Sequence, residues 1–164
     1  MSEKPIDLER VANECREFAQ QFQTVQLATA SAEGVPEASY APFYREGRDF
    51  YLFLSELSRH CRNLAENPRA SLLLIENEND AANLFARQRL VYQCACQEVE
   101  RRGERFEQTM DAFQAKFGNM IGLLRELADF HLYRIAPLSG TYVAGFAKAF
   151  ELVGKDLDEV RHIG

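Results

Sequence analysis

The sequence predicts a mainly antiparallel β-sheet with flanking helices, an α+β fold closed into a barrel. Short runs that alternate apolar and polar residues, or that are rich in aromatic and β-branched residues, recur between turns containing Gly, Pro or Asn. Their order is β-β-β-α-β-β-α-β-β, whereas a doubly wound sheet would alternate strand and helix strictly. We therefore expect an antiparallel barrel with helices at its rim.

The N-terminal third predicts one helix and three strands. Residues 7–22 repeat apolar side chains at helical spacing, and Asp7 is available as the N-cap. The run 25–30 then alternates like a half-buried strand, and 38–43 follows across a glycine-containing turn. Residues 50–54 are a strongly β-prone third strand.

The rest of the chain predicts two helices and four strands. A short helix starts at Ser58 and ends before Pro68. A longer helical region at 103–127 carries apolar residues in steps of three and four, and its glycines Gly118 and Gly122 weaken its middle. The strands are apolar or period-two runs, at 69–76, 89–101, 130–135 and 141–152.

These elements are expected to form one domain over residues 1–164. The helix lies at about 7–22, the barrel at about 24–152 and a C-terminal tail at 153–164. A length of 164 residues is typical of a single domain, and no internal repeat or linker interrupts the sequence.

Charge and hydropathy disfavour several classes of function. Nineteen basic against twenty-five acidic residues give a net charge of −6, which disfavours binding to nucleic acid or to an anionic membrane. No apolar run is long enough to span a bilayer, and the first residues lack the apolar core of a signal peptide, so a cytoplasmic protein is expected. The four cysteines form no C-x-x-C pair and are expected to be reduced, apolar side chains.

Basic residues gather at the start of the short helix. Ser58, Arg59, His60 and Arg62 lie within five positions, where a helix N-terminus and cationic side chains suit a phosphate or carboxylate. The same pattern is also typical of a solvated helix start with a charged face. The residues by themselves leave both interpretations open.

Two arginines, two histidines and one aspartate are further candidates for chemistry. Arg87 and Arg89 lie in otherwise apolar sequence on one predicted strand face, and they either hold an anionic ligand or form structural ion pairs. His131 shares a face with Asp129, which favours a polar, outward-facing side of its strand. His162 is near the C-terminus, where a histidine is usually solvated.

Short motifs also follow one another in a specific order. They are Gln26-Leu27-Ala28-Thr29-Ala30, Gly34-x-Pro36, Ser39-Tyr40-Ala41-Pro42-Phe43 and Arg59-His60-x-Arg62-Asn63-Leu64-x-x-Asn67-Pro68. In this order they resemble the opening of the pyridoxamine-phosphate-oxidase-like, FMN-binding split barrels. Three more motifs resemble one branch of that superfamily, the HugZ/HutZ haem-utilisation proteins. These are Leu84-Phe85-Ala86-Arg87-Gln88-Arg89-Leu90, Asp129-Phe130-His131-Leu132-Tyr133-Arg134 and Val143-x-Gly145-Phe146-Ala147-x-Ala149-Phe150.

The resemblance covers about residues 15–162 and implies a homodimeric split β-barrel that binds haem near the dimer interface. Proteins of this branch can degrade haem oxidatively and release iron, with electrons from an external reductant. They ligate the haem iron through a C-terminal histidine, and His162 either matches that ligand or lies upstream of it. Asp129 matches an aspartate that assists the ligand histidine. Arg89, and next to it Arg87, matches an arginine of the haem pocket.

Two alternatives to a haem oxygenase-like oxidoreductase stay open. Many split barrels are FMN-dependent oxidoreductases whose phosphate is held by the segment that here contains Ser58, Arg59, His60 and Arg62, although flavin enzymes often carry lysine where His60 stands. A non-catalytic haem carrier fits the same motifs, and only turnover with a reductant would separate it from an oxygenase.

Overall fold

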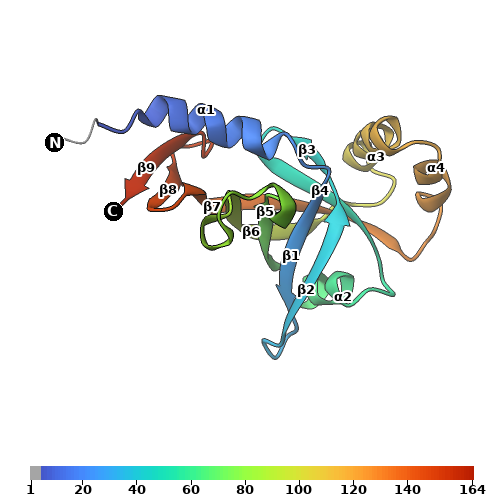
Figure 1. Cartoon of the computed structure of the whole chain (residues 1–164). Coiled ribbons are helices and arrows are strands. Elements are labelled where there is room, and N and C mark those ends of the chain that lie inside the picture. The colour runs from blue at the N-terminus through green and yellow to red at the C-terminus, as the bar shows by residue number, and fades with distance from the viewer. Residues whose placement is uncertain (1–4) are drawn as a thin grey trace. The chain divides into compact units, whose positions relative to one another are not determined.

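A computed structural model describes residues 5–164 of the chain (Figure 1). Its contacts divide the chain into two compact units. The first unit comprises the segment up to Phe22 together with Leu73–Tyr92 and Ser139–Gly164. The second comprises Gln23–Leu72 and Gln93–Leu138. The single domain expected over 1–164 stays a prediction.

The strands belong to one sheet, with the order β2-β1-β5-β6-β7-β4-β3, and β8 and β9 continue from β7. The pairs β1/β2, β3/β4, β4/β7, β7/β8 and β8/β9 are all antiparallel, which confirms the predicted fold class. The bounds are β1 Thr24–Ala30, β2 Pro36–Pro42, β3 Tyr44–Glu46, β4 Asp49–Ser55, β5 Arg69–Ile75, β6 Arg89–Glu98, β7 Phe130–Gly145, β8 Lys148–Val153 and β9 Glu159–Ile163.

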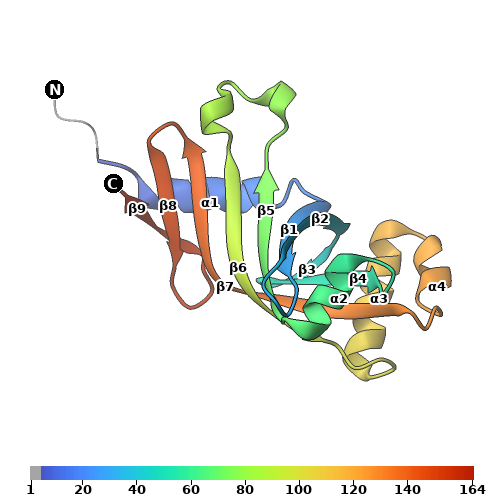
Figure 2. The ribbon, with the colours of Figure 1, turned by 90° about the horizontal axis from the view of Figure 1, so that it is seen from below.

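Helix α1 (Leu8–Ala19) covers the β8 and β9 side of the first unit, as Figures 1 and 2 show. It begins at Asp7, whose side chain accepts a hydrogen bond from the Arg10 amide, as the sequence predicts. Its apolar face brings Phe18 onto the fully buried Tyr142, with 6.1 Å between ring centroids. Tyr142 in turn lies 6.5 Å from Phe150 of β8, so aromatic rings form much of this core.

The second unit carries the remaining helices, α2 (Arg59–Glu66), α3 (Glu104–Phe117) and α4 (Met120–Leu124). Gly118, at φ +90°, ends α3, so the helical region at 103–127 is broken at the predicted place. Arg125 then ties the two helices together through Glu107 (2.5 Å) and Asp111 (2.8 Å). The core beneath them consists of Tyr51, Phe106, Met110, Phe113, Ile121 and Leu132.

The C-terminal strands differ from the predicted pair at 130–135 and 141–152. β7 runs unbroken through Gly140, because this glycine makes room for a neighbour: a Cβ there would lie 2.7 Å from Leu152 Cδ1. The chain turns only after Gly145, where Ala147 takes a left-handed φ of +57°. Residues 159–163, expected within a tail, form β9, because they pair along their length with β8.

Candidate functional site

The phosphate clamp predicted from Ser58, Arg59, His60 and Arg62 lies in the second unit, but its side chains already contact other groups of the protein. The Ser58 hydroxyl donates to the Ser55 carbonyl oxygen (2.6 Å), and no side chain caps α2. Arg62 Nη1 donates to the carbonyl oxygens of Glu56 (3.1 Å) and Leu57 (3.3 Å). Arg62 therefore supports the turn before α2 rather than pointing a free charge at a ligand.

The other two members of this clamp offer little unpaired positive charge. Arg59 forms an ion pair with Glu37 over 3.3 Å. The His60 ring lies 2.8 Å from the Ser39 hydroxyl, and burial lowers the pKa of His60, partly opposed by Glu37. A neutral imidazole and a paired guanidinium attract a phosphate dianion much less than lysine would.

Asp129 lies beside the same turn. The pairing of β4 with β7 places Ser55 opposite Phe130, so the residues just beyond the two strand ends meet. The Ser55 hydroxyl donates to Asp129 Oδ2 (3.2 Å), and the Glu56 amide donates to the Asp129 carbonyl oxygen (2.8 Å). The half-buried carboxylate is thus held in place through Oδ2, and Oδ1 takes no part in the bond from Ser55.

His131 is more closely held than an outward-facing polar residue. Its Nδ1 lies 2.5 Å from Glu98 Oε1, and its Nε2 lies 2.6 Å from Glu56 Oε1. Neither glutamate is predicted from the sequence. Alternation along β7 is a signal for the exposed face of His131, but only the order β6-β7-β4 shows that Glu98 and Glu56 flank it.

Arg87 and Arg89 belong to the first unit, and they do not share a strand face as predicted. Arg87 lies outside β6, after a 3₁₀ turn (Leu84–Ala86), because its guanidinium closes the β5–β6 loop. It donates to the Glu76 carbonyl oxygen, with Nε at 3.1 Å, and faces Glu78 at 3.7 Å. Arg89 begins β6 and has one such bond, from Nη1 to the Arg87 carbonyl oxygen (3.1 Å). Of the two, Arg89 is the better placed to hold an added anion.

His162 also belongs to the first unit, on β9. It faces Phe150 of β8 in the strand register, with 5.3 Å between the ring centroids. The backbone of Gly164 lies close to the ring, since a Cβ there would be 2.6 Å from His162 Cε1. The imidazole is exposed, and neither ring nitrogen has a hydrogen bond within residues 5–164.

The three histidines therefore differ in the contacts of their ring nitrogens. Both nitrogens of His131 contact carboxylates, and Nδ1 of His60 contacts a hydroxyl. His162 has an electron pair available without breaking a bond seen in the structure. A neutral imidazole of this kind is a good axial ligand for haem iron. The imidazole of His162 is therefore a donor that fits a haem group.

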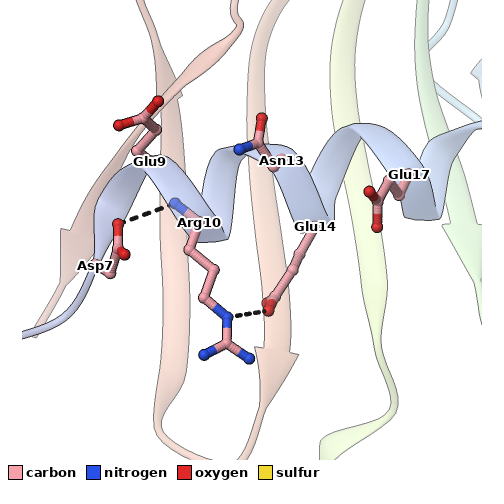
Figure 3. Close-up of a pocket in the computed structure, with 6 residues that line it drawn as sticks. All are labelled: Asp7, Glu9, Arg10, Asn13, Glu14 and Glu17. Atoms are coloured by element: carbon pink, nitrogen blue, oxygen red, sulfur yellow. Dashed lines mark hydrogen bonds and ion pairs between the residues drawn. The ribbon is translucent and has the colours of Figure 1, made fainter.

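Two hollows of the first unit lie along α1. One of about 470 Å³ is lined by Asp7, Glu9, Arg10, Asn13, Glu14 and Glu17 (Figure 3). Its charge is mainly negative, and its one cation is tied to Glu14 over 3.0 Å, so it suits neither a phosphate nor a propionate. The other, of about 420 Å³, lies against β9 and is lined by Leu8, Glu9, Ala12, Arg16, Asp158, Glu159 and Val160.

The four cysteines are buried thiols. Burial raises the pKa of Cys61 to about 11 and those of Cys94 and Cys96 to about 12, which keeps the thiols protonated. Within residues 5–164, no cluster of three or more His, Cys, Asp or Glu side chains is arranged to hold a metal ion. None of the helices in this range is long and apolar enough to cross a membrane.

Comparison with known proteins assigns the family. A family model described as pyridoxamine 5'-phosphate oxidase matches residues 11–144. The haem oxygenase HutZ of Vibrio cholerae serotype O1 is 40% identical over 154 residues, which cover 94% of this chain and 88% of that protein. The chain is a HutZ-type member of the pyridoxamine 5'-phosphate oxidase-like split-barrel superfamily.

Solved structures agree with this assignment of the HutZ-type chain. The crystal structure of Vibrio cholerae HutZ, described there as a haem storage protein, is 41% identical with a TM-score of 0.72, covering 76% of this chain and 88% of that one. Campylobacter jejuni ChuZ is 34% identical with a TM-score of 0.84. That match covers 99% of this chain and 65% of ChuZ, so the HutZ-type chain spans about two thirds of ChuZ.

Proposed function

We propose that this HutZ-type protein binds haem and degrades it oxidatively with release of iron. The observation that carries the proposal is 40% identity, over 94% of the chain, to a protein named haem oxygenase HutZ. The description of a HutZ structure as a haem storage protein supports haem binding as well. The two names differ in chemistry, so catalysis has to be tested separately from binding.

We assign His162 as the axial ligand of the haem iron. Its ring nitrogens have no hydrogen bond to any described residue, and the ring packs against Phe150. Exposed apolar side chains lie at the same end of the β7–β8 hairpin and β9, since Ala149 pairs with Ile163. Phe146, in the turn of that hairpin, is 76% exposed and provides apolar surface for a porphyrin face, whereas Ile163 follows His162 on β9 and therefore points to the other face of the strand.

Asp129 and Arg89 are the proposed catalytic residues of this function. A carboxylate that accepts the second N–H of the ligand imidazole fixes its tautomer and raises its basicity, and Ser55 holds Asp129 in one orientation for that task. The guanidinium of Arg89 would pair with a propionate, and Arg87 would keep its loop in place. Bound haem supplies the redox chemistry, with electrons from an external reductant.

The proposal includes two statements about the protein in the cell. We infer a homodimer that binds haem near its interface. We also infer a cytoplasmic location, where thiols such as the four buried cysteines stay reduced.

A haemin titration of the purified protein tests binding and assigns the ligand. We expect a saturable Soret band at one haem per chain, lost in His162→Ala and kept in Arg161→Gln, the neighbouring exposed residue of β9. A band unchanged in His162→Ala would overturn the ligand assignment. Adding a reductant and oxygen should then bleach the band and release iron to a chelator, whereas a stable band would identify a carrier.

The family description favours FMN as a second candidate. Its binding would use the Ser58, Arg59, His60 and Arg62 segment, where the structure has one arginine paired and one turned to carbonyl groups. Fluorescence titration with FMN checks this candidate. Saturable quenching that is lost in Arg59→Gln, with no Soret band for haemin, would replace the haem proposal.

A further inference from the structure

We propose that His131 is a positioning residue, an imidazolium that ties Glu56 to Glu98 and thereby holds the corner formed by Ser55 and Asp129. This inference rests on the proposed function in one respect, since Asp129 is there the carboxylate that serves the haem ligand. The contacts themselves belong to the protein without haem, so they can be tested without it.

The sheet order places His131 between the two glutamates. β7 lies between β6 and β4, so Glu98 at the end of β6 and Glu56 just after β4 reach the imidazole from its two sides. The N···O distances of 2.5 and 2.6 Å are those of charge-assisted hydrogen bonds. A metal ion between either pair would need about 2 Å to each ligand atom, which these distances do not allow.

The number of donors indicates the protonation state. A neutral imidazole has one N–H and one lone pair, whereas an ionised carboxylate only accepts. Glu56 and Glu98 are about half exposed, and solvated carboxylates are ionised at neutral pH. Both nitrogens can donate only if His131 carries two ring protons. A neutral ring would turn a lone pair towards one carboxylate at hydrogen-bond distance.

The surroundings favour the same state. Burial disfavours the charged imidazole, but hydrogen bonds and charge from Glu98 and Glu56 outweigh it, so the pKa of His131 is raised. Burial, together with the charge of these carboxylates, raises the pKa of Tyr133 to about 12 and that of Cys61 to about 11, so both are neutral. The cations of this region, Arg62 and Arg101, donate to the carbonyl oxygens of Glu56 and Phe130.

The residues of the Glu56 turn are hydrogen-bonded to Asp129, so the contact of His131 with Glu56 also affects Asp129. The Glu56 amide donates to the Asp129 carbonyl oxygen, and the Ser55 hydroxyl donates to the Asp129 carboxylate. When pH rises through the pKa of His131, the ring keeps one donor and releases one glutamate. Because the one remaining N–H can go to either Glu98 or Glu56, the Glu56 turn and the Asp129 carboxylate then keep this support only part of the time.

Nuclear magnetic resonance of the haem-free protein tests this inference. Ring ¹⁵N shifts of His131 should report an imidazolium at neutral pH. The amide-exchange protection factor of Glu56 should fall about tenfold as His131 deprotonates, the loss expected for one charged hydrogen bond. A neutral ring at pH values where the fold is intact, or protection that does not follow the titration, would overturn the proposal.

Three variants separate positioning from general stability. In His131→Gln the Glu56 protection factor should be low and independent of this titration. In Glu98→Gln the pH dependence should weaken, because the glutamine amide can donate to a neutral ring and leaves the remaining ring N–H to Glu56. Arg105→Gln removes an exposed ion pair with Glu46 in the same unit and should leave the profile as in the wild type. None of these readouts involves haem, so a failed haemin titration would leave this result standing.

Discussion

The imidazole of His162 packs on the phenyl ring of Phe150, with 5.3 Å between the ring centroids. Phe150 is 1% exposed and lies against Tyr142, so an exposed residue of the last strand is supported by the core of its unit. β9 pairs only with β8 in the described sheet, and the ring contact adds to that pairing.

Phe150→Leu should therefore weaken haem binding more than it weakens the fold. The substitution keeps an apolar side chain in the core at a cost of roughly 1–2 kcal/mol, whereas Phe150→Ala should cost about 3–5 kcal/mol. Without the ring, His162 loses the surface on which it packs. Haemin titration and urea unfolding measure the two effects, and an unchanged haem affinity in Phe150→Leu would show that the contact does not orient the ligand.

Asp129→Asn should lower haem turnover while haem binding and the fold are retained. The amide oxygen of asparagine still accepts the Ser55 hydroxyl, but it carries no charge to strengthen the ligand imidazole. Turnover with a reductant and the haem absorption spectrum check this. Normal turnover together with an unchanged spectrum would remove Asp129 from the catalytic residues.

Arg87→Ala should mainly lower stability, whereas Arg89→Ala should mainly lower haem turnover. Arg87 is 21% exposed and bonds the Glu76 carbonyl, so its loss should lower the unfolding free energy by about 1–3 kcal/mol. Arg89→Ala should leave thermal stability nearly intact and reduce turnover, because its guanidinium has a single backbone partner. Melting curves and turnover of both variants test these expectations. A large loss of stability in Arg89→Ala would show that Arg89 is a structural arginine.

His60 should make the protein less stable on the acid side. Its pKa is lowered in the folded state, chiefly by burial, so the unfolded chain binds more protons between the folded pKa and about 6.5. Its contribution is complete above about pH 6.5 and is lost as pH falls through that window. Urea unfolding as a function of pH should lose this acid-side slope in His60→Gln. Equal slopes in both proteins would contradict the expected shift.

Gly140→Ala should destabilise the protein although glycine lies within a strand. The new methyl group would meet Leu152 Cδ1 at 2.7 Å and Tyr92 Cδ1 at 3.1 Å, and overpacking of this kind costs about 1–3 kcal/mol. Adding Leu152→Val should recover part of the loss. If Gly140→Ala is as stable as the wild type, Leu152 moves aside without cost.

Local patterns were sufficient for most elements. The Asp7 cap, the alternation of β1 and the break at Gly118 follow from near neighbours in the chain, and the structure has all three. The strand predicted to end at residue 135 continues instead through Gly140. Packing against Leu152, which is twelve residues away, makes that glycine part of a continuous strand.

The sequence by itself determined the fold class, the membership of a haem-related branch and the candidate residues, because periodicity and ordered motifs are local properties of the chain. Only the tertiary structure decided which of these residues are free. It engages Arg62, Arg87 and both nitrogens of His131, and it leaves the nitrogens of His162 open. The partners of His131 lie 33 and 75 positions away in the sequence, and their register exists only in the folded sheet. The partners of Arg62 and Arg87 lie nearer in the chain, but which carbonyl oxygens they reach depends on how the turns fold.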